Sequence, residues 1–203
     1  MYNKRISKGL SVLAAGLLAS GMVAAEAPEA CVACHNDNGV SKDPAVPTLA
    51  GNAAFFIENQ LYLFQAGDRP CVDDYFAGKA DVDLANHCAA LEGMSEEQFA
   101  EIGAHYEGLS YAAFTQDVDA GLAAKGEALH MDGCERCHTE AGSVMEDEAG
   151  ILAGQPKAYM IAQLKHYRAG ERPPSEMNEA AEGLSDEDIQ ALAEFYAREG
   201  SRF

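Results

Sequence analysis

Basic residues are scarce in this sequence. Its 203 residues include 14 Lys and Arg against 33 Asp and Glu, which gives a formal net charge of −19. Such an acidic surface repels nucleic acid and anionic membranes, and we expect no nucleic-acid partner. The same charge favours docking onto a basic partner and also favours solubility in salty surroundings. The sequence leaves these two interpretations open.

Long apolar runs are lacking beyond the first 25 residues. That segment has a basic start at Lys4, Arg5 and Lys8, an apolar run over 10–23, and small residues at 23–25. The pattern is typical of a secretory signal peptide. A membrane anchor is the alternative, but the run is short and interrupted by Ser and Gly. We therefore expect residues 1–25 to be cleaved on export to the periplasm, leaving a chain that does not span the membrane.

Strand-like alternation is also absent, and the helical spacing of apolar residues predicts an all-α fold. Residues 52–66 and 155–169 carry this spacing, and each segment ends at an Ala-Gly stop. Ser95 and Gln98 have the spacing of a capping box ahead of a further helix, and Ser185 begins a matching one. Another helix is expected over 119–131.

The sequence repeats itself. A shift of 103 residues places 31–70 on 134–173 without a gap, and a shift of 90 then matches 94–106 with 184–196. The first copy therefore holds 13 extra residues between Pro70 and Met94. This pattern indicates a tandem duplication. We predict a first domain over 26–107, a linker over 108–118 and a second domain over 119–203.

Each copy opens with the motif Cys-x-x-Cys-His, the attachment signature of c-type haem. Two thiols add to the two vinyl groups of the porphyrin, and the histidine becomes an axial ligand of the iron. A shared zinc is disfavoured because the two motifs lie far apart, and a thioredoxin-like dithiol because no βαβ unit is predicted. Two covalently bound haem c groups are therefore expected, and His35 and His138 are the predicted iron ligands. The haem-binding residues are Cys31, Cys34, His35, Cys134, Cys137 and His138.

The stretches CVACH…LAG…QL…AG and CERCH…LAGQ…QL…AGERP…M…LSDEDI resemble the diheme cytochrome c4 family over nearly all of residues 26–200. The segment around CERCHTEAG…ILAGQ is particularly similar to the cytochrome subunit of flavocytochrome c sulfide dehydrogenases. The resemblance implies two cytochrome c domains related by a pseudo-twofold axis, with the haem edges close together. It also implies that the protein transfers electrons.

The resemblance also points to the second axial ligand of each iron. In this family a methionine lies seven residues before the leucine of the LSD motif, which is Met177 before Leu184 in the second domain. The same position in the first domain is His87. Met94 and Cys88 are the alternatives there, because no methionine occurs between His35 and Met94.

The two remaining cysteines, Cys71 and Cys88, lie 17 residues apart and flank the insertion. In an exported protein they are expected to form a disulfide. Such a pair would remove Cys88 as a ligand and favour His87. A free Cys88 beside the first haem would instead indicate sulfur chemistry.

Several other residues carry expectations of their own. By resemblance, the Pro47 carbonyl accepts the second ring N–H of His35, whereas the second domain has Gly150 at that position. Arg69 and Arg172, in a shared turn, either pair with haem propionates or are surface charges. Tyr106 and Tyr196 are predicted to pack in the core. The remaining histidines are predicted to be solvated at the surface: His105, His130 and His166.

These features predict a periplasmic diheme electron carrier without substrate turnover of its own. Methionine raises a haem potential relative to histidine, so we expect a lower-potential first haem and a higher-potential second one. The alternative is the haem subunit of a flavocytochrome c sulfide dehydrogenase. A third interpretation is a sulfur-compound oxidoreductase acting through Cys88. The sequence has no flavin motif, so the expected partners are redox proteins such as a flavoprotein subunit or a terminal oxidase.

Overall fold

The structure is a computed structural model that describes residues 29–71 and 86–203. The predicted signal peptide and most of the predicted insertion lie outside these residues. Within them the protein is helical and contains no strand, which confirms the all-α prediction. The first half contains α1 (Glu29–His35), α2 (Ala54–Gln65), the 3-10 turn η2 (Ala89–Leu91) and α3 (Glu96–Glu107). The second half contains α4 (Ala120–Gly133), α5 (Thr139–Gly142), η3 (Met145–Asp147), α6 (Lys157–Arg168), α7 (Glu176–Glu182), α8 (Asp186–Glu199) and η4 (Gly200–Arg202).

The helix starts follow from local capping chemistry. The Ser95 hydroxyl accepts from the backbone N–H of Gln98, and the Gln98 side chain accepts from the Ser95 N–H, which confirms the predicted capping box. Ser185 and Asp188 form the same reciprocal pair at the start of α8. Each cap satisfies backbone donors that the first helical turn leaves unpaired.

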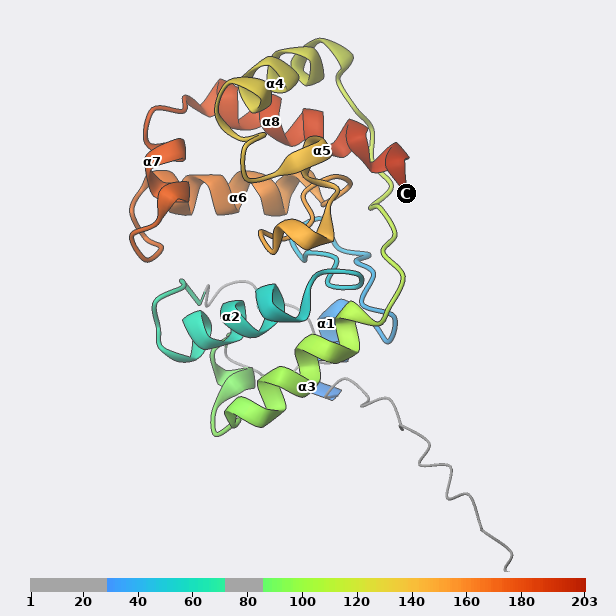
Figure 1. Cartoon of the computed structure of the whole chain (residues 1–203), viewed down its shortest axis with the longest axis vertical. Helices are drawn as coiled ribbons and strands as arrows, with labels where there is room; N and C mark the ends of the chain where they lie inside the picture. The colour runs from blue at the N-terminus through green and yellow to red at the C-terminus, as the bar shows by residue number, and fades with distance from the viewer. Residues whose placement is uncertain (1–28, 72–85) are drawn as a thin grey trace, which may run out of the picture.

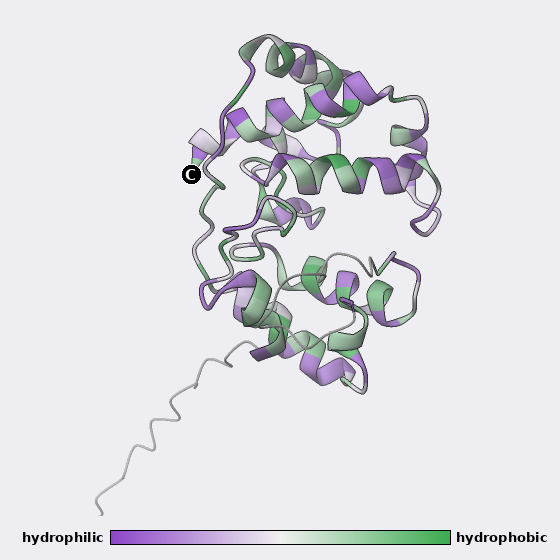
Figure 2. Cartoon of the chain, turned by 180° about the vertical axis from the view of Figure 1, so that it is seen from behind, coloured by the Kyte–Doolittle hydropathy of each residue, from purple (hydrophilic) through white to green (hydrophobic). Residues whose placement is uncertain are grey.

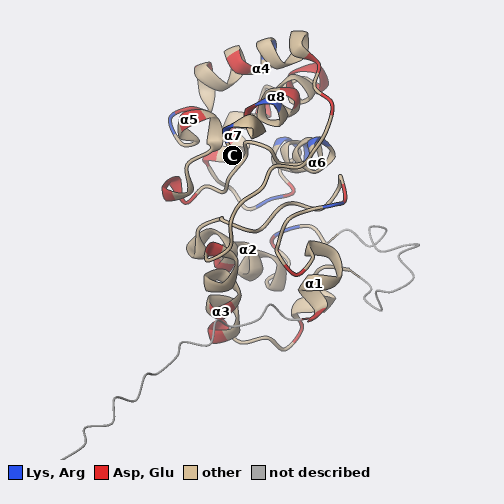
Figure 3. Ribbon diagram, turned by 90° about the vertical axis from the view of Figure 1, so that its right-hand side faces the viewer, with Lys and Arg blue, Asp and Glu red and all other residues tan. Residues whose placement is uncertain are grey.

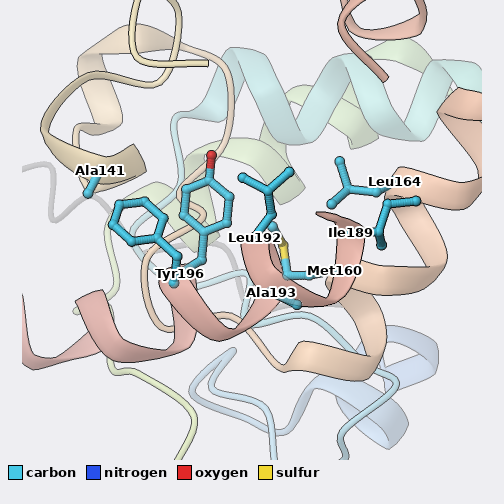
Figure 4. Close-up of a cluster of buried hydrophobic side chains, with 8 residues drawn as sticks. Ala141, Met160, Leu164, Ile189, Leu192, Ala193 and Tyr196 are labelled. Atoms are coloured by element: carbon cyan, nitrogen blue, oxygen red, sulfur yellow. The ribbon is translucent and has the colours of Figure 1, made fainter. Parts of the chain in front are cut away.

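Each half buries its own hydrophobic cluster. In the first half α2 packs on α3, and in the second half α8 packs on α4 and α6. The helices of both halves are amphipathic, with hydrophilic residues beside hydrophobic ones (Figure 2). Figure 4 shows the second cluster, in which Met160 and Leu164 of α6 lie near Leu192 and Tyr196 of α8. Tyr196 and its counterpart Tyr106 are both buried, as predicted.

The two halves repeat the same backbone contacts. The Gly39 carbonyl accepts from Leu49 N–H at 2.8 Å, and the Gly142 carbonyl accepts from Leu152 N–H at the same distance. Both glycines have positive φ, +65° and +70°, a conformation that favours glycine over residues with a Cβ. The repeated sequence therefore produces a repeated fold.

The halves also contact each other reciprocally. The backbone N–H of Thr48 donates to the Gln155 side chain at 2.9 Å, and that of Ile151 donates to the Asn52 side chain at 2.8 Å. The shift of 103 residues maps Thr48 onto Ile151 and Asn52 onto Gln155. Each half thus gives the other the same bond that it receives, as pseudo-twofold symmetry requires.

The predicted linker, residues 108–118, runs along one side of the molecule between α3 and α4 (Figure 1). It is held to the second half, where the Tyr111 hydroxyl donates to the Ala153 carbonyl at 2.7 Å and Phe114 N–H donates to the Gly154 carbonyl at 2.8 Å. Among residues 29–71 and 86–203 no helix has the length and apolar character needed to cross a membrane.

Candidate haem sites

The first site begins on α1, a helix of about two turns that carries Cys31, Cys34 and His35. The His35 side chain is buried, and its Nδ1 lies 3.1 Å from the Pro47 carbonyl oxygen, as the sequence predicted. Because the carbonyl can only accept, Nδ1 must be protonated, which leaves Nε2 as a lone-pair donor. The ring is therefore held in the tautomer that a metal ligand needs.

A cavity of about 430 Å³ adjoins this motif. Cys31, Cys34 and His35 line it, and His87 lines it as well. The other walls are largely apolar and come from both halves of the chain. A volume of this size is typical of a cofactor pocket.

His87 is placed to act together with His35. Their ring centroids lie 6.5 Å apart with the ring planes perpendicular. With metal–nitrogen bonds of about 2 Å, two imidazoles on opposite sides of one metal ion have centroids about 6 Å apart. The buried Nδ1 of His87 has no hydrogen-bond partner among the described residues. The observed pair therefore fits a bis-histidine iron.

The electrostatic environment keeps His87 neutral. Burial, followed by the positive charges of the neighbouring His35 and Arg69, lowers its pKa to about 3. The ring also packs against Phe64, with centroids 4.1 Å apart. A neutral, sterically held imidazole is the form that binds a metal.

The two alternative ligands of the first site are placed elsewhere. Cys88 is joined to Cys71 in a disulfide with a Cα–Cα distance of 5.7 Å. Met94 packs against the hydrophobic cluster of the first half and is absent from the described residues that line the cavity.

The second site is built on the same Cys-x-x-Cys-His motif, but the contacts of its histidine differ from those in the first site. Cys134 follows directly after α4, and its backbone N–H donates to the His130 carbonyl at 2.8 Å. His138 is buried, and burial followed by the nearby His130 lowers its pKa to about 4. Its Nδ1 has no hydrogen-bond partner among the described residues, in contrast to His35. The Pro47 contact is therefore not repeated at Gly150.

A second cavity, of about 100 Å³, lies beside this motif. Cys134, His138 and Met177 all line it. Met177 lies on α7 and packs against the hydrophobic cluster of the second half. The cavity walls thus bring together the imidazole and thioether that the sequence predicted as a ligand pair.

The two cavities share part of their walls. Arg69 also lines the first cavity, and Arg172 also lines the second. The residues that line both are Phe56, Gln60, Leu152, Tyr159 and Gln163. One layer of side chains therefore separates the two sites.

Comparisons with known proteins agree with this arrangement. Residues 121–195 match the family model described as cytochrome c oxidase, cbb3-type, subunit III. A thiosulfate dehydrogenase electron acceptor from Stutzerimonas stutzeri (strain A1501) is 34% identical over 180 residues, which is 85% of this chain and 80% of that protein. A cytochrome c4 from Stutzerimonas stutzeri is 31% identical over 179 residues, which is 81% of this chain and 82% of that protein. This chain belongs to the cytochrome c4 family.

The structural comparison supports the same assignment. The crystal structure of reduced recombinant cytochrome c4 from Pseudomonas stutzeri matches with a TM-score of 0.67 at 27% identity, covering 83% of this chain and 93% of that one. Members of the cytochrome c4 family are diheme c-type cytochromes. The predicted fold of two tandem cytochrome c domains and the two covalently bound haem c groups are thereby confirmed.

One histidine expectation is wrong. His130 lies on α4 and is only 1% exposed, because α8 packs against α4. Its Nδ1 lies 3.0 Å from the Tyr196 hydroxyl, and its Nε2 contacts Glu135 within the second haem-binding motif. His105 and His166 are half-buried rather than fully solvated, and His166 Nδ1 lies 2.5 Å from Glu171.

The surface-charge interpretation of the two turn arginines is also wrong. Arg69 and Arg172 are 7% and 5% exposed. Both contact Gln60 and Gln163, which occupy equivalent positions of the two copies and were not among the predicted site residues. The presence of a glutamine at the same position of both copies was the sequence signal that could have identified Gln60 and Gln163 as site residues.

Proposed function

We propose that this cytochrome c4 family member is a periplasmic diheme electron carrier with no substrate turnover of its own. Its two haem irons would supply reversible one-electron chemistry. The observation that carries the proposal is the shared wall of the two cavities, which brings the two sites within one layer of side chains. Electron transfer between the two haems needs such proximity.

We assign Cys31 and Cys34 to the first haem and Cys134 and Cys137 to the second. His35 and His138 are the proximal ligands on this assignment. The separation between His35 and His87, together with the orphaned nitrogen of His87, supports a bis-histidine first site. Met177, on the same cavity wall as His138, supports a His/Met second site.

The ligand sets imply an order of potentials. A thioether ligand raises the potential of a haem relative to a second imidazole. The first haem is therefore the lower-potential site and the second haem the higher-potential one, so electrons favour the direction from first to second.

Spectroscopy and potentiometry of the haem-loaded protein test this proposal. Low-temperature spin resonance of the oxidised protein should show one bis-histidine and one His/Met signal. A redox titration should show two separate one-electron waves, the lower of which belongs to the bis-histidine haem. One coincident wave, or two His/Met signals, would contradict the assignment.

The named relatives favour one class of electron donor. A relative that is 34% identical, from Stutzerimonas stutzeri, is named a thiosulfate dehydrogenase electron acceptor. This name favours a thiosulfate-oxidising partner over a flavoprotein. Asp and Glu lie on helices of both halves (Figure 3), and they suit a basic docking face. With Cys88 in a disulfide, sulfur chemistry on this chain itself is disfavoured. Reduction of the chain by thiosulfate only when a thiosulfate dehydrogenase is added would support this partner, whereas reduction by thiosulfate alone would oppose it.

A further inference from the structure

The residue that follows each assigned second axial ligand contacts the same carbonyl of the repeat. In the second half this residue is Asn178, and its side-chain nitrogen donates to the Tyr167 carbonyl at 3.0 Å. In the first half it is Cys88, whose Sγ lies 3.0 Å from the Phe64 carbonyl oxygen. The shift of 103 residues maps Phe64 onto Tyr167, and the shift of 90 residues maps Cys88 onto Asn178. The two contacts are therefore equivalent, and each ties a ligand segment to the end of a helix that lines a cavity.

The two halves make this tie by different chemistry. The Asn178 amide donates a hydrogen bond to a carbonyl, and its oxygen accepts from the Ser175 hydroxyl at 2.8 Å. Cys88 is bonded to Cys71, so its sulfur carries no hydrogen and only packs against the carbonyl of Phe64. A covalent bond therefore stands in the first half where a hydrogen bond stands in the second.

The disulfide joins two segments of the first cavity wall. Cys71 directly follows Pro70, and Cys88 directly follows His87; both Pro70 and His87 line the cavity. His87 precedes the short turn η2, whereas its counterpart lies within the longer helix α7. The ring of His87 packs on Phe64, and its buried Nδ1 has no hydrogen-bond partner among the described residues. The adjacent disulfide is therefore the covalent restraint on the position of this imidazole.

We propose that the Cys71–Cys88 disulfide positions His87 on the first iron, so that coordination there depends on the thiol–disulfide state of the chain. This inference rests on the proposed bis-histidine first haem. Both cysteines are half-buried rather than enclosed, so a small dithiol in solution can reach them. The second site has Asn178 in place of a cysteine, so the same dithiol leaves its ligand unaffected.

Reduction proceeds by thiol–disulfide exchange with a dithiol. One thiolate of the dithiol attacks a sulfur of the disulfide, the bond between Cys71 and Cys88 breaks, and a mixed disulfide forms. The second thiolate then attacks the mixed disulfide and leaves with the first as a cyclic disulfide, so that two electrons and two protons end on the two cysteines. The free Cys88 thiol is only a weak hydrogen-bond donor to the Phe64 carbonyl. His87 then dissociates from the iron more often, and the first haem opens to external ligands.

The test uses the haem-loaded Cys71→Ser/Cys88→Ser double variant, without reductant. Spin resonance of the oxidised protein should show a high-spin signal in place of the bis-histidine signal, with the His/Met signal unchanged. The reduced first haem should bind carbon monoxide about tenfold more tightly or better, because the ligand binds only molecules in which His87 has dissociated.

The unmodified protein offers the same test without a substitution. It is treated with dithiothreitol, alkylated with iodoacetamide and reoxidised with ferricyanide, after which its first haem should match that of the double variant. Alkylation reaches only Cys71 and Cys88, because the other four cysteines are held as thioethers on the proposed haem assignment. Iodoacetamide without dithiothreitol is the control and should change neither haem.

Two matched variants separate positioning from general loss of stability. Phe99 is fully buried in the hydrophobic cluster of the first half and is absent from the described residues that line the cavity. Phe99→Leu should therefore weaken the first half in urea unfolding and leave the bis-histidine signal intact. Asn178→Ala should loosen the ligand of the second haem alone, and dithiothreitol should not change that effect.

The outcomes distinguish the anchor from the function on which it rests. A double variant that keeps the bis-histidine signal and the original carbon monoxide affinity overturns the anchor. A Phe99→Leu variant that loses His87 to the same extent also overturns it, since any loss of stability would then have this effect. The unmodified oxidised protein is measured first. Absence of a bis-histidine signal there would refute the proposed ligand set and the anchor with it, and its presence makes the two failures distinguishable.

Discussion

The crossing of α4 and α8 leaves no room for a side chain at Gly126. A Cβ built there would lie 2.0 Å from the Ala191 carbonyl oxygen and 2.7 Å from the Phe195 Cβ. Ordinary contact begins at 3.4 Å, so Gly126→Ala must separate the two helices by about 1.4 Å. The obstructing atom belongs to the backbone, which cannot rotate away as a side chain can.

Two effects of opposite sign determine the change in stability. Overpacking costs about 1–3 kcal/mol, and alanine gains about 1 kcal/mol over glycine within a helix. Because the contact is with backbone, we expect the upper part of that range and a net loss of about 2 kcal/mol in the free energy of unfolding. The second haem site should suffer most, since Leu192 and Tyr196 of α8 line its cavity.

Urea unfolding of the haem-loaded protein, followed by circular dichroism and haem absorption, measures the loss. Gly133→Ala is the control, because it lies in the same helix and a Cβ there meets nothing within 4 Å. It should leave stability unchanged or raise it by at most about 1 kcal/mol. Equal stability of the two variants would refute the close approach of α4 and α8.

Three further predictions concern the axial ligands and the disulfide. Replacing Cys71 and Cys88 together by Ser should cost about 3 kcal/mol in urea unfolding, since a disulfide closing a loop of this length restricts the unfolded chain; an unchanged midpoint would contradict this. His87→Met should raise the potential of the first haem towards that of the second in a redox titration, with the second wave unmoved. Burial lowers the pKa of His87 to about 3 and that of His138 to about 4, so the unfolded chain binds more protons below about pH 6.5. Stability measured by urea unfolding should therefore fall as the pH drops from 6.5 to 4, by about 1.4 kcal/mol per pH unit for each histidine. Metal binding acts in the same direction, because it too requires the neutral ring, and stability independent of pH across this window would contradict the burial of both rings.

Much of the fold could be predicted because its determinants are local and occur twice. The capping box of Ser95, the apolar spacing of α2 and α6, and the Cys-x-x-Cys-His motifs each lie within a short window of sequence. The repeat then supplied the pseudo-symmetry, since equivalent residues occupy equivalent positions. Met177 and His87 were placed by position in the motif, and both lie on cavity walls.

The features that sequence reasoning missed depend on contacts between distant segments. His130 lies on α4, and only the packing of α8, which brings Tyr196 within hydrogen-bond distance, makes it a buried residue. Arg69 and Arg172 follow Ala-Gly turns, which normally lie at the surface. They are buried because one half of the molecule covers the turn of the other, and a pattern within either copy carries no information about that contact.

The differences between the two copies are as informative as their likeness. The backbone hydrogen bonds repeat in both halves, including those that the Gly39 and Gly142 carbonyls accept. The histidine contacts differ. The His35 ring donates to the Pro47 carbonyl, whereas Nδ1 of His138 has no hydrogen-bond partner among the described residues. The first cavity is also lined by the His87 imidazole, and the second by the Met177 thioether. Duplication by itself would give two equal potentials, and thermodynamically no preferred direction for an electron. On the proposed ligand assignment, the substitutions from imidazole to thioether would give the two haems different potentials on a backbone that remains symmetric.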